Sequence, residues 1–413
     1  MTAPHLPITA TFDHAAMAVG GCAIEDLVAE HGTPLQIIDT ADIDHRALEY
    51  RKALDGLSRP ARAVFATKAL PVLAVIARLG QHGIGADVTT AGELALARAA
   101  GIEPARIVQH GNARSREELR EAAQRNVGLI VLDGPQDVEH LDAEAAGPVD
   151  VLLRITPGIA PVTHESMATA HHGQKFGVTL DEAPSTFRAV TASKHLRLRG
   201  VHFHIGSQIT ALEPFADAVR RVAALGSFEI LDAGGGLGVP FTNEMVTPGI
   251  GAHISVLDDA MSAAGFDAGT ELIVEPGRSL VARAVITVYR IRTVKQTAGQ
   301  TFVAVDGGTS DDIEAVTGLR TPAPFALGTG KRSKVTLVGL HCDSGDVLAR
   351  DVPFPKVAPG SLVVMPGTGA YTFSLANNYN CVPRPAVVEV DGGRSRTVVR
   401  RETIADLLNR QTR

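Results

Sequence analysis

The stretch Ala63-Val64-Phe65-Ala66-Thr67-Lys68-Ala69-Leu70 is a short apolar run with one charged residue, Lys68. Pro71 comes next, and apolar residues then recur at helical spacing from Val72 to Leu79. A buried strand that carries an amine at its carboxyl end, with a helix directly behind it, is how a β/α barrel presents a reactive residue. Taken alone, the stretch is also compatible with a strand that simply ends at the surface.

The same pattern of a short apolar run followed by a helix repeats along the chain. The clearest helix, Ser115–Asn126, opens with the capping box Ser115-Arg116-Glu117-Glu118. Eight strands over about 220 residues predict a (β/α)8 barrel, and a doubly wound open sheet is the alternative. The predicted strands are Ala63–Ala66, Gly83–Val88, Arg106–Gln109, Gly128–Leu132, Val149–Ile155, Leu198–His204, Phe228–Leu231 and Glu271–Glu275.

Beyond residue 280 the pattern changes to alternating apolar and polar residues, rich in Val, Ile and Tyr. This alternation predicts a second domain of antiparallel β-strands. We therefore expect the barrel over residues 39–279 and the β domain over residues 280–413. The segment 1–38, which includes most of a predicted strand from Leu35 to Asp39, is expected to pack with the β domain.

Composition limits the class of protein. The chain has 413 residues, 45% hydrophobic and 20% charged, with a net charge of −6. This fits a globular protein and disfavours nucleic acid as a partner. Neither a signal peptide nor a membrane span is predicted, so a cytoplasmic location is expected. Three widely spaced cysteines suggest free thiols.

Functional side chains fall where the predicted barrel strands end, which is where such barrels place their active sites. Seven of the eight strand ends carry a functional side chain or a glycine loop. They are Lys68, Asp87, His110-Gly111-Asn112, Arg154, the pair His202 and His204, Asp232 with Gly234–Gly236, and Glu275-Pro276-Gly277-Arg278.

The last two strand ends predict a phosphate site, because glycines let backbone N–H groups approach phosphate oxygens and Arg278 adds a charged fork. A phosphate site, a lysine and a nearby carboxylate together suggest pyridoxal 5′-phosphate. Lys68 would form the Schiff base. Glu275 would keep the pyridine nitrogen protonated, and His204 would lie against the ring. A tight turn remains the alternative for the glycine run alone.

A metal-dependent hydrolase is the competing class. His202 and His204 lie two apart on a predicted strand, and His171-His172 adds two more imidazoles. No further ligands are evident at the other strand ends, so no metal site is expected. His202 alone is more simply a structural histidine.

Ten stretches of the chain, taken in order, match a known family. In order they are Phe65-Ala66-Thr67-Lys68-Ala69, Gly92-Glu93-Leu94, His110-Gly111-Asn112, Thr163-His164-Glu165, Gln174-Lys175-Phe176-Gly177, His204-Ile205-Gly206-Ser207-Gln208, Gly234-Gly235-Gly236-Leu237-Gly238, Glu275-Pro276-Gly277-Arg278, His341-Cys342-Asp343-Ser344-Gly345-Asp346 and Gly369-Ala370-Tyr371. Together they resemble the fold-type III pyridoxal-phosphate decarboxylases, and among these the diaminopimelate decarboxylases.

The resemblance implies an alanine racemase-like fold, with a barrel and a C-terminal β-sandwich or β-barrel domain, and a homodimer that shares its active sites. Lys68 and Cys342 would be catalytic, with the partner subunit's Cys342 protonating the carbanion. The residues expected around the cofactor are Lys68, Asp87, His204, Ser207, Gly235, Gly236, Glu275, Gly277, Arg278 and Tyr371. Arg278, Glu314, Gly318 and Asp343 are expected to face the substrate. A buried, inert thiol is the alternative for Cys342.

Three positions depart from the resemblance. Diaminopimelate decarboxylases usually grip the distal carboxylate with an arginine and a tyrosine, and these positions hold Glu314 and Gly318 here. The usual glutamate after the cysteine is the shorter Asp343. A carboxylate facing Glu314 would be repelled.

The departures favour a changed substrate: a neutral or extended aminoacyl group, amide-linked or tethered to a carrier protein, or a basic amino acid. Genuine meso-diaminopimelate decarboxylation, with Arg320 or another residue binding the distal carboxylate, is the alternative. Glu275 argues against a racemase, which normally uses an arginine at that position. The presence of Lys68 and Cys342 argues against a silent binding homologue.

Overall fold

The computed structural model describes residues 3–13, 16–159 and 175–412. The chain divides into two compact units. The barrel unit contains Arg46–Gly238 and Thr247–Ser279, and the β unit contains Met1–His45, Val239–Val246 and Leu280–Arg413. Residues 239–246 therefore leave the barrel unit in the middle of its sequence.

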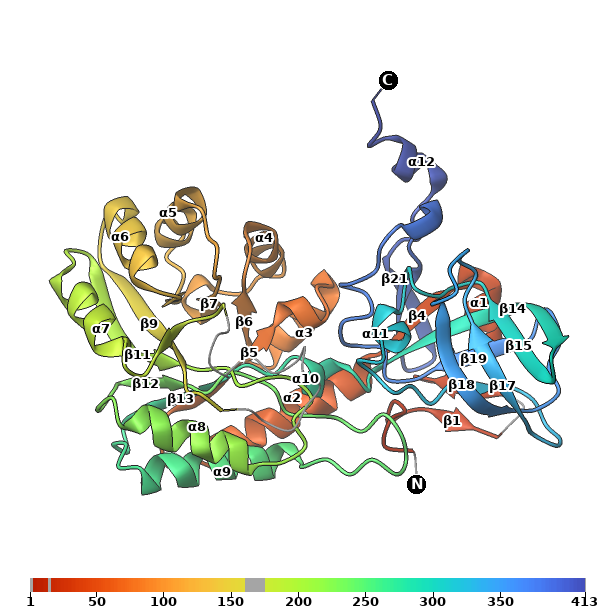
Figure 1. Ribbon diagram of the computed structural model, residues 1–413, viewed down its shortest axis with the longest axis horizontal. Coiled ribbons are helices and arrows are strands. Elements are labelled where there is room, and N and C mark those ends of the chain that lie inside the picture. Colours follow the sequence, from red (N-terminus) through yellow and green to blue (C-terminus); the bar gives the residue numbers. More distant parts are fainter. Residues whose placement is uncertain (1–2, 14–15, 160–174, 413) are drawn as a thin grey trace. The chain divides into compact units, whose positions relative to one another are not determined.

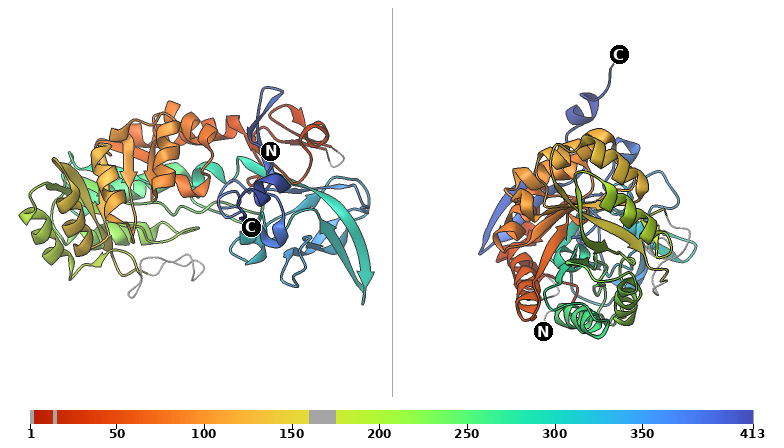
Figure 2. Two further views of the ribbon diagram at one scale, coloured as in Figure 1. Left: turned by 90° about the horizontal axis from the view of Figure 1, so that it is seen from above. Right: turned by 90° about the vertical axis from the view of Figure 1, so that its left-hand side faces the viewer.

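The barrel unit is a closed ring of eight parallel strands (Figures 1 and 2). The ring runs β9-β11-β12-β13-β5-β6-β7-β8, and pairing of β8 with β9 closes it. The predicted (β/α)8 barrel is confirmed, and closure excludes an open sheet. The strands are β5 (Ala61–Ala66), β6 (Gly85–Val88), β7 (Ile107–Gln109), β8 (Leu129–Leu132), β9 (Val149–Thr156), β11 (Leu196–His202), β12 (Ile230–Asp232) and β13 (Glu271–Val274), with β10 (Val178–Thr179) added beside β9.

Helices surround the ring because each presents one apolar stripe to it. In α8 (Glu213–Ala223) this stripe contains Phe215, Ala218, Val219 and Val222, which are buried at helical spacing. The predicted capping box opens α5 (Arg116–Gln124), where Ser115 accepts a hydrogen bond from the Glu118 backbone. The others are α2 (Thr40–Asp55), α3 (Leu73–Gln81), α4 (Ala91–Ala99), α6 (Pro135–Glu144), α7 (Ala183–Ala192), α9 (Ile250–Ala263) and α10 (Arg278–Val281).

The β unit is built on a sheet ordered β18-β17-β15-β14-β4-β20-β21, with β19 on β14 and β16 on β19. Most pairings are antiparallel as predicted, but β15–β17 and β4–β20 are parallel. The partners of each parallel pair are separated by long segments, which is what a parallel crossover requires. The N-terminal strand β4 lies between β14 and β20, inside this sheet.

The main strands are β4 (Leu35–Asp39), β14 (Val285–Thr297), β15 (Gln300–Val305), β16 (Phe325–Ala326), β17 (Ser333–Val338), β18 (Val347–Phe354), β19 (Leu362–Met365), β20 (Ala386–Asp391) and β21 (Arg394–Val399). A smaller sheet contains β1 (Thr11–Phe12), β2 (Met17–Val19) and β3 (Cys22–Ala23), and the helices are α1 (Ile24–His31), α11 (Ile313–Val316) and α12 (Ile404–Leu408). In the described ranges, no helix has the length and apolar character needed to span a membrane.

Candidate active site

Lys68 lies directly beyond the carboxyl end of β5, in the short 3₁₀ helix η1 (Thr67–Ala69), and its side chain is exposed. Thr67 holds this turn against the next strand, because its hydroxyl donates a 2.5 Å hydrogen bond to the Asp87 carbonyl. Burial raises the pKa of Asp87 to about 6, although His110 and Lys68 act to lower it. The amine therefore sits at the mouth of the ring, beside a buried carboxyl group.

Glu275 is the centre of the barrel mouth. It is 6% exposed and follows β13 directly. Nε2 of His110 lies 2.5 Å from Oε1 of Glu275, and Nε2 of His202 lies 3.4 Å from Oε2. Burial alone would favour the neutral acid, but the two imidazoles outweigh it and hold the pKa of Glu275 well below its usual value. Glu275 is therefore a carboxylate at neutral pH.

Two other buried groups near Glu275, His202 and Asp232, have pKa values shifted toward their neutral forms. Burial lowers the pKa of His202 to about 3. Burial and the adjacent negative charge of Glu275 raise the pKa of Asp232 well above its usual value. Like charges in one buried site cannot all ionise, so Glu275 carries the charge and Asp232 the proton. Such an arrangement suits a cationic ring N–H opposite Glu275.

The glycine loop after β12 forms a cradle that only glycine can build. A Cβ on Gly235 would lie 2.2 Å from the Glu275 carbonyl oxygen. A Cβ on Gly236, which has φ of +119°, would lie 2.4 Å from the Gly206 carbonyl oxygen. Nδ1 of His204 accepts a 3.2 Å hydrogen bond from the Gly235 N–H. The loop after β11, which contains Ser207, and the loop after β12 are thus fixed together.

His204 is a neutral ring at this site. Burial, reinforced by the charge of Lys68, lowers its pKa well below the usual value. A base with so low a pKa is weak, which agrees with a packing role. The strand ends at His202, so His204 belongs to the following loop and has different partners from His202.

The last strand end completes the cradle. A Cβ on Gly277 would lie 3.1 Å from the Ala66 Cβ, so the small residue keeps β5 and β13 close at their tips. Arg278 begins α10 and is 6% exposed. Nine of the predicted residues lie in the barrel unit, namely Lys68, Asp87, His204, Ser207, Gly235, Gly236, Glu275, Gly277 and Arg278. An amine, a buried carboxylate, a glycine cradle and an arginine fit pyridoxal phosphate.

The remaining predicted residues lie in the β unit. Cys342 and Asp343 are exposed on one loop, so the buried-thiol alternative for Cys342 is wrong. Asn380 accepts a 3.3 Å hydrogen bond from the Cys342 N–H, and the Tyr379 hydroxyl lies 3.4 Å from Asp343. Tyr371 is half-buried with φ of +63°.

The substrate stretch forms the short helix α11 and its ends. Glu314 is 4% exposed within the helix. Gly318 follows it with φ of +76°, in the left-handed conformation that closes a helix. A tyrosine at this position would strain the turn, so Gly318 also has a structural role.

The Arg320 side chain is buried and paired inside the β unit. Its guanidinium pairs with the Asp312 carboxylate, and both side chains are 0% exposed. It also donates a 3.2 Å hydrogen bond to the Pro366 carbonyl. An arginine held in this way is poorly suited to grip a substrate.

Two features of the barrel site were not predicted. The sequence places His110 at the end of a strand, but it did not predict the contact with Glu275, which forms only when the ring of strands closes. His253 on α9 is 2% exposed and faces the glycine loop from behind, in a crevice that includes Tyr50 and Ser279. Its apolar, helical surroundings in the sequence gave no signal of this position. His171-His172 and Thr163-His164-Glu165 lie outside the described residues.

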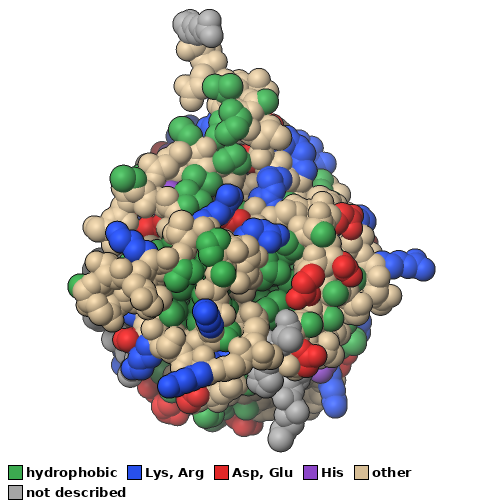
Figure 3. All heavy atoms as spheres, turned by 90° about the vertical axis from the view of Figure 1, so that its right-hand side faces the viewer, with side chains coloured by type: hydrophobic (Ala, Val, Ile, Leu, Met, Phe, Trp, Pro, Cys, Tyr) green, Lys and Arg blue, Asp and Glu red, His purple; other side chains and the backbone are tan. Residues whose placement is uncertain are grey.

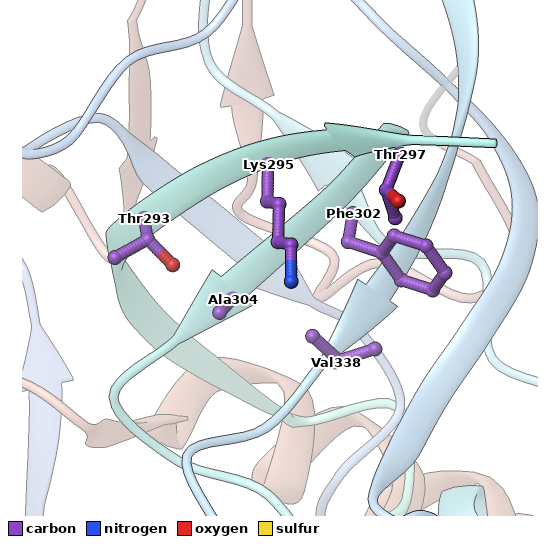
Figure 4. Close-up of a pocket in the computed structure, with 6 residues that line it drawn as sticks. All are labelled: Thr293, Lys295, Thr297, Phe302, Ala304 and Val338. Atoms are coloured by element: carbon purple, nitrogen blue, oxygen red, sulfur yellow. The ribbon is translucent and has the colours of Figure 1, made fainter. Parts of the chain in front are cut away.

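The β unit also has a shallow pocket on the outer part of its sheet (Figure 4). Thr293, Lys295 and Thr297 project from one side of β14 toward Phe302 and Val338. These residues, with Ala304, offer one amine and no carboxylate, thiol or imidazole, so the pocket lacks the groups for catalysis.

On the face in Figure 3, hydrophobic side chains are mixed with Lys and Arg.

The fold and site define an enzyme that uses pyridoxal phosphate. The sequence model of the family described as "Pyridoxal-dependent decarboxylase, pyridoxal binding domain" matches residues 40–282. This chain belongs to that family. It is a pyridoxal-phosphate-dependent decarboxylase, and the hydrolase alternative is wrong.

Individual relatives agree with this assignment. The chain is 41% identical to a diaminopimelate decarboxylase of Actinosynnema pretiosum, over 98% of this chain and 94% of the relative. It is 39% identical to the one of Mycobacterium tuberculosis, over 96% and 95%. The crystal structure of diaminopimelate decarboxylase from M. jannaschii in co-complex with L-lysine is similar, with a TM-score of 0.93, 27% identity and 98% coverage of both chains.

Proposed function

We propose that this chain removes one carboxylate of meso-diaminopimelate and releases L-lysine. One observation carries the proposal. Eight relatives with 34–41% identity, matched over 91–95% of their own length, are all named diaminopimelate decarboxylase. Similar solved structures hold L-lysine, which is the product this reaction would release.

Pyridoxal phosphate, when bound, draws electrons from the substrate α-carbon and so makes loss of carbon dioxide possible. The residues of this chain would hold and tune it. Lys68 would attach it covalently, and the glycine loop with Arg278 would hold its phosphate. The Glu275 carboxylate would keep the ring nitrogen protonated. The exposed Cys342 thiol would deliver the proton that replaces the lost carboxylate, from a partner subunit in a homodimer.

A second candidate is a substrate whose distal end is not a carboxylate. It is supported by the buried Glu314 at the position where an arginine is expected, and by the pairing of Arg320 with Asp312. A cationic side chain, an amide or a carrier-bound aminoacyl group would avoid repulsion by Glu314. The two candidates share the same decarboxylation chemistry and differ in the distal group.

Carbon dioxide release distinguishes them. The purified enzyme is assayed with meso-diaminopimelate, L-lysine, L-ornithine, an amide-extended amino acid and a carrier-bound aminoacyl group. We expect kcat/KM for meso-diaminopimelate to exceed every other value by about a hundredfold. If another compound is preferred by that margin, the second candidate replaces the first.

The variant Glu314→Arg, with Glu314→Gln as its matched control, tests the distal contact directly. Under the first proposal, the wild type already turns over meso-diaminopimelate efficiently, and Glu314→Arg gives no gain. A rise of about tenfold or more with Glu314→Arg but not with Glu314→Gln would support the second candidate.

A further inference from the structure

The barrel mouth contains three metal-ligating side chains that do not come from one sequence motif. They are His110 after β7, His202 at the end of β11 and Glu275 after β13. Their donor atoms all lie within 4.8 Å of one another, and the side chains are 8%, 1% and 6% exposed. The rings of the two histidines meet edge-on, with centroids 4.7 Å apart.

We propose that, when the cofactor is absent, His110, His202 and Glu275 bind one divalent transition-metal ion such as Zn²⁺, and that this ion excludes pyridoxal phosphate. Two imidazoles and one carboxylate are a ligand set typical of zinc, with a fourth position left open. Nε2 of His110 lies 3.8 Å from Oδ1 of Asp87, so Asp87 or a water molecule would occupy the fourth coordination position.

The spacing of the donors suits such an ion. Zinc bonds of about 2.0–2.1 Å place tetrahedral ligands roughly 3.3 Å apart. Nε2 of His202 and Oε2 of Glu275 are already 3.4 Å apart, whereas the 2.5 Å between His110 and Glu275 must widen. Nε2 of His110 and Oε1 of Glu275 now contact each other, so a bound ion would replace this contact with bonds to both atoms.

The types of ligand atom also determine which ion is favoured. The nitrogen-rich set favours Zn²⁺, Ni²⁺ or Cu²⁺ over Mg²⁺ and Ca²⁺, which prefer oxygen ligands.

Competition with the cofactor follows from the shared carboxylate. A metal-bound Glu275 cannot pair with the pyridine nitrogen, and a dication beside a protonated ring is repulsive. The reverse also holds, because a ring seated on Glu275 removes one of three ligands and closes access to the other two. The cluster therefore has two mutually exclusive occupants.

The first experiment compares the holoenzyme with protein from which the cofactor has been removed. Zn²⁺ and Mg²⁺ are titrated by calorimetry, and Co²⁺ by its visible absorbance. We expect one saturable Zn²⁺ event in the cofactor-free protein, none at that site in the holoenzyme, and none with Mg²⁺. Prior Zn²⁺ should slow the return of cofactor absorbance on adding pyridoxal phosphate, and a chelator should restore it.

The second experiment assigns the ligands, using cofactor-free variants whose circular dichroism matches the wild type. His202→Asn and Glu275→Gln should each weaken Zn²⁺ binding at least about tenfold, which is the least that even an outer partner of a metal site contributes. His140→Asn, on α6 and away from the cluster, is the control and should leave the affinity unchanged.

The proposal is overturned if cofactor-free protein binds no Zn²⁺, or if the holoenzyme binds it equally well. Unchanged affinity in both ligand variants would also overturn it. If a variant does not fold, the comparison of holoenzyme with cofactor-free wild type decides by itself. Because these readouts need no substrate, they do not depend on whether meso-diaminopimelate is decarboxylated.

Discussion

Glu275 carries the electrostatic function of the barrel mouth. Changing Glu275→Gln removes its charge and nearly preserves its shape. We expect kcat to fall by about a hundredfold or more, because a neutral amide cannot stabilise a protonated ring nitrogen. Steady-state assays, with cofactor content measured by absorbance, test this. A kcat within twofold of wild type at full cofactor content would refute the role of the carboxylate.

His253 is a buried neutral histidine, and this has a consequence for stability. Burial lowers its pKa from 6.5 to about 4. The unfolded chain therefore takes up this proton below about pH 6.5, whereas the folded protein does not until about pH 4. The contribution of neutral His253 to the free energy of unfolding is therefore fully present above pH 6.5. It is lost as the pH falls, and the loss reaches about 3 kcal/mol at pH 4.

The variant His253→Gln removes this titration. Urea unfolding of cofactor-free protein between pH 7 and 4.5 should give a shallower loss of stability in the variant than in the wild type. The buried carboxyl groups titrate in both proteins, so their effects cancel in the comparison. Equal slopes would show that His253 is not kept neutral by burial.

At the scale of elements, the glycine loop after β12 is the part of the site least able to change. Gly235→Ala places a methyl group 2.2 Å from the Glu275 carbonyl, which is backbone and cannot move aside cheaply. We expect cofactor affinity to fall by at least about tenfold, because the cradle and Glu275 must separate. Equilibrium loading followed by absorbance measures it.

The matched control lies on the next helix. A Cβ on Gly251 of α9 meets nothing within 4 Å. Gly251→Ala should leave cofactor affinity unchanged and stabilise the helix slightly, since alanine is the better helix former. Equal losses of cofactor in the two variants would mean that the tight contact at Gly235 is not what matters.

At the scale of the whole molecule, the barrel unit holds Lys68 and the β unit holds Cys342. We predict a homodimer in which each site combines these residues from different subunits. Lys68→Ala and Cys342→Ala should each be inactive alone. Co-expressed, they should recover about a quarter of wild-type activity, because half of the dimers are mixed and each has one intact site.

This prediction fails if co-expressed variants stay inactive while sedimentation shows that mixed dimers form. Activity of Cys342→Ala on its own close to wild type would instead remove the thiol from the reaction. Neither outcome bears on the proposed attachment of the cofactor to Lys68.

The sequence by itself determined the barrel, the order of its strands and most of the groups at its mouth. Apolar runs of strand length alternate with amphipathic helices, and a parallel barrel places every strand end on one face. Lys68, Asp87, Glu275 and the glycine loops could therefore be assigned together without coordinates. The sequence alone left a tight turn as the alternative for the glycine run, and the structure shows that a Cβ at Gly235 or Gly236 would meet backbone atoms.

Only the tertiary structure decided which of these groups touch. Ring closure brings β7, β11 and β13 to one centre, so His110 and His202 meet Glu275 across gaps of 165 and 73 residues in the sequence, by difference of their numbers. The fold of the β unit pairs Arg320 with Asp312, and the fold of the barrel unit brings His253 beside the glycine loop. Local sequence sets which side chain stands at each strand end. Charge state and contact depend on burial and on distant neighbours, which exist only in the folded chain.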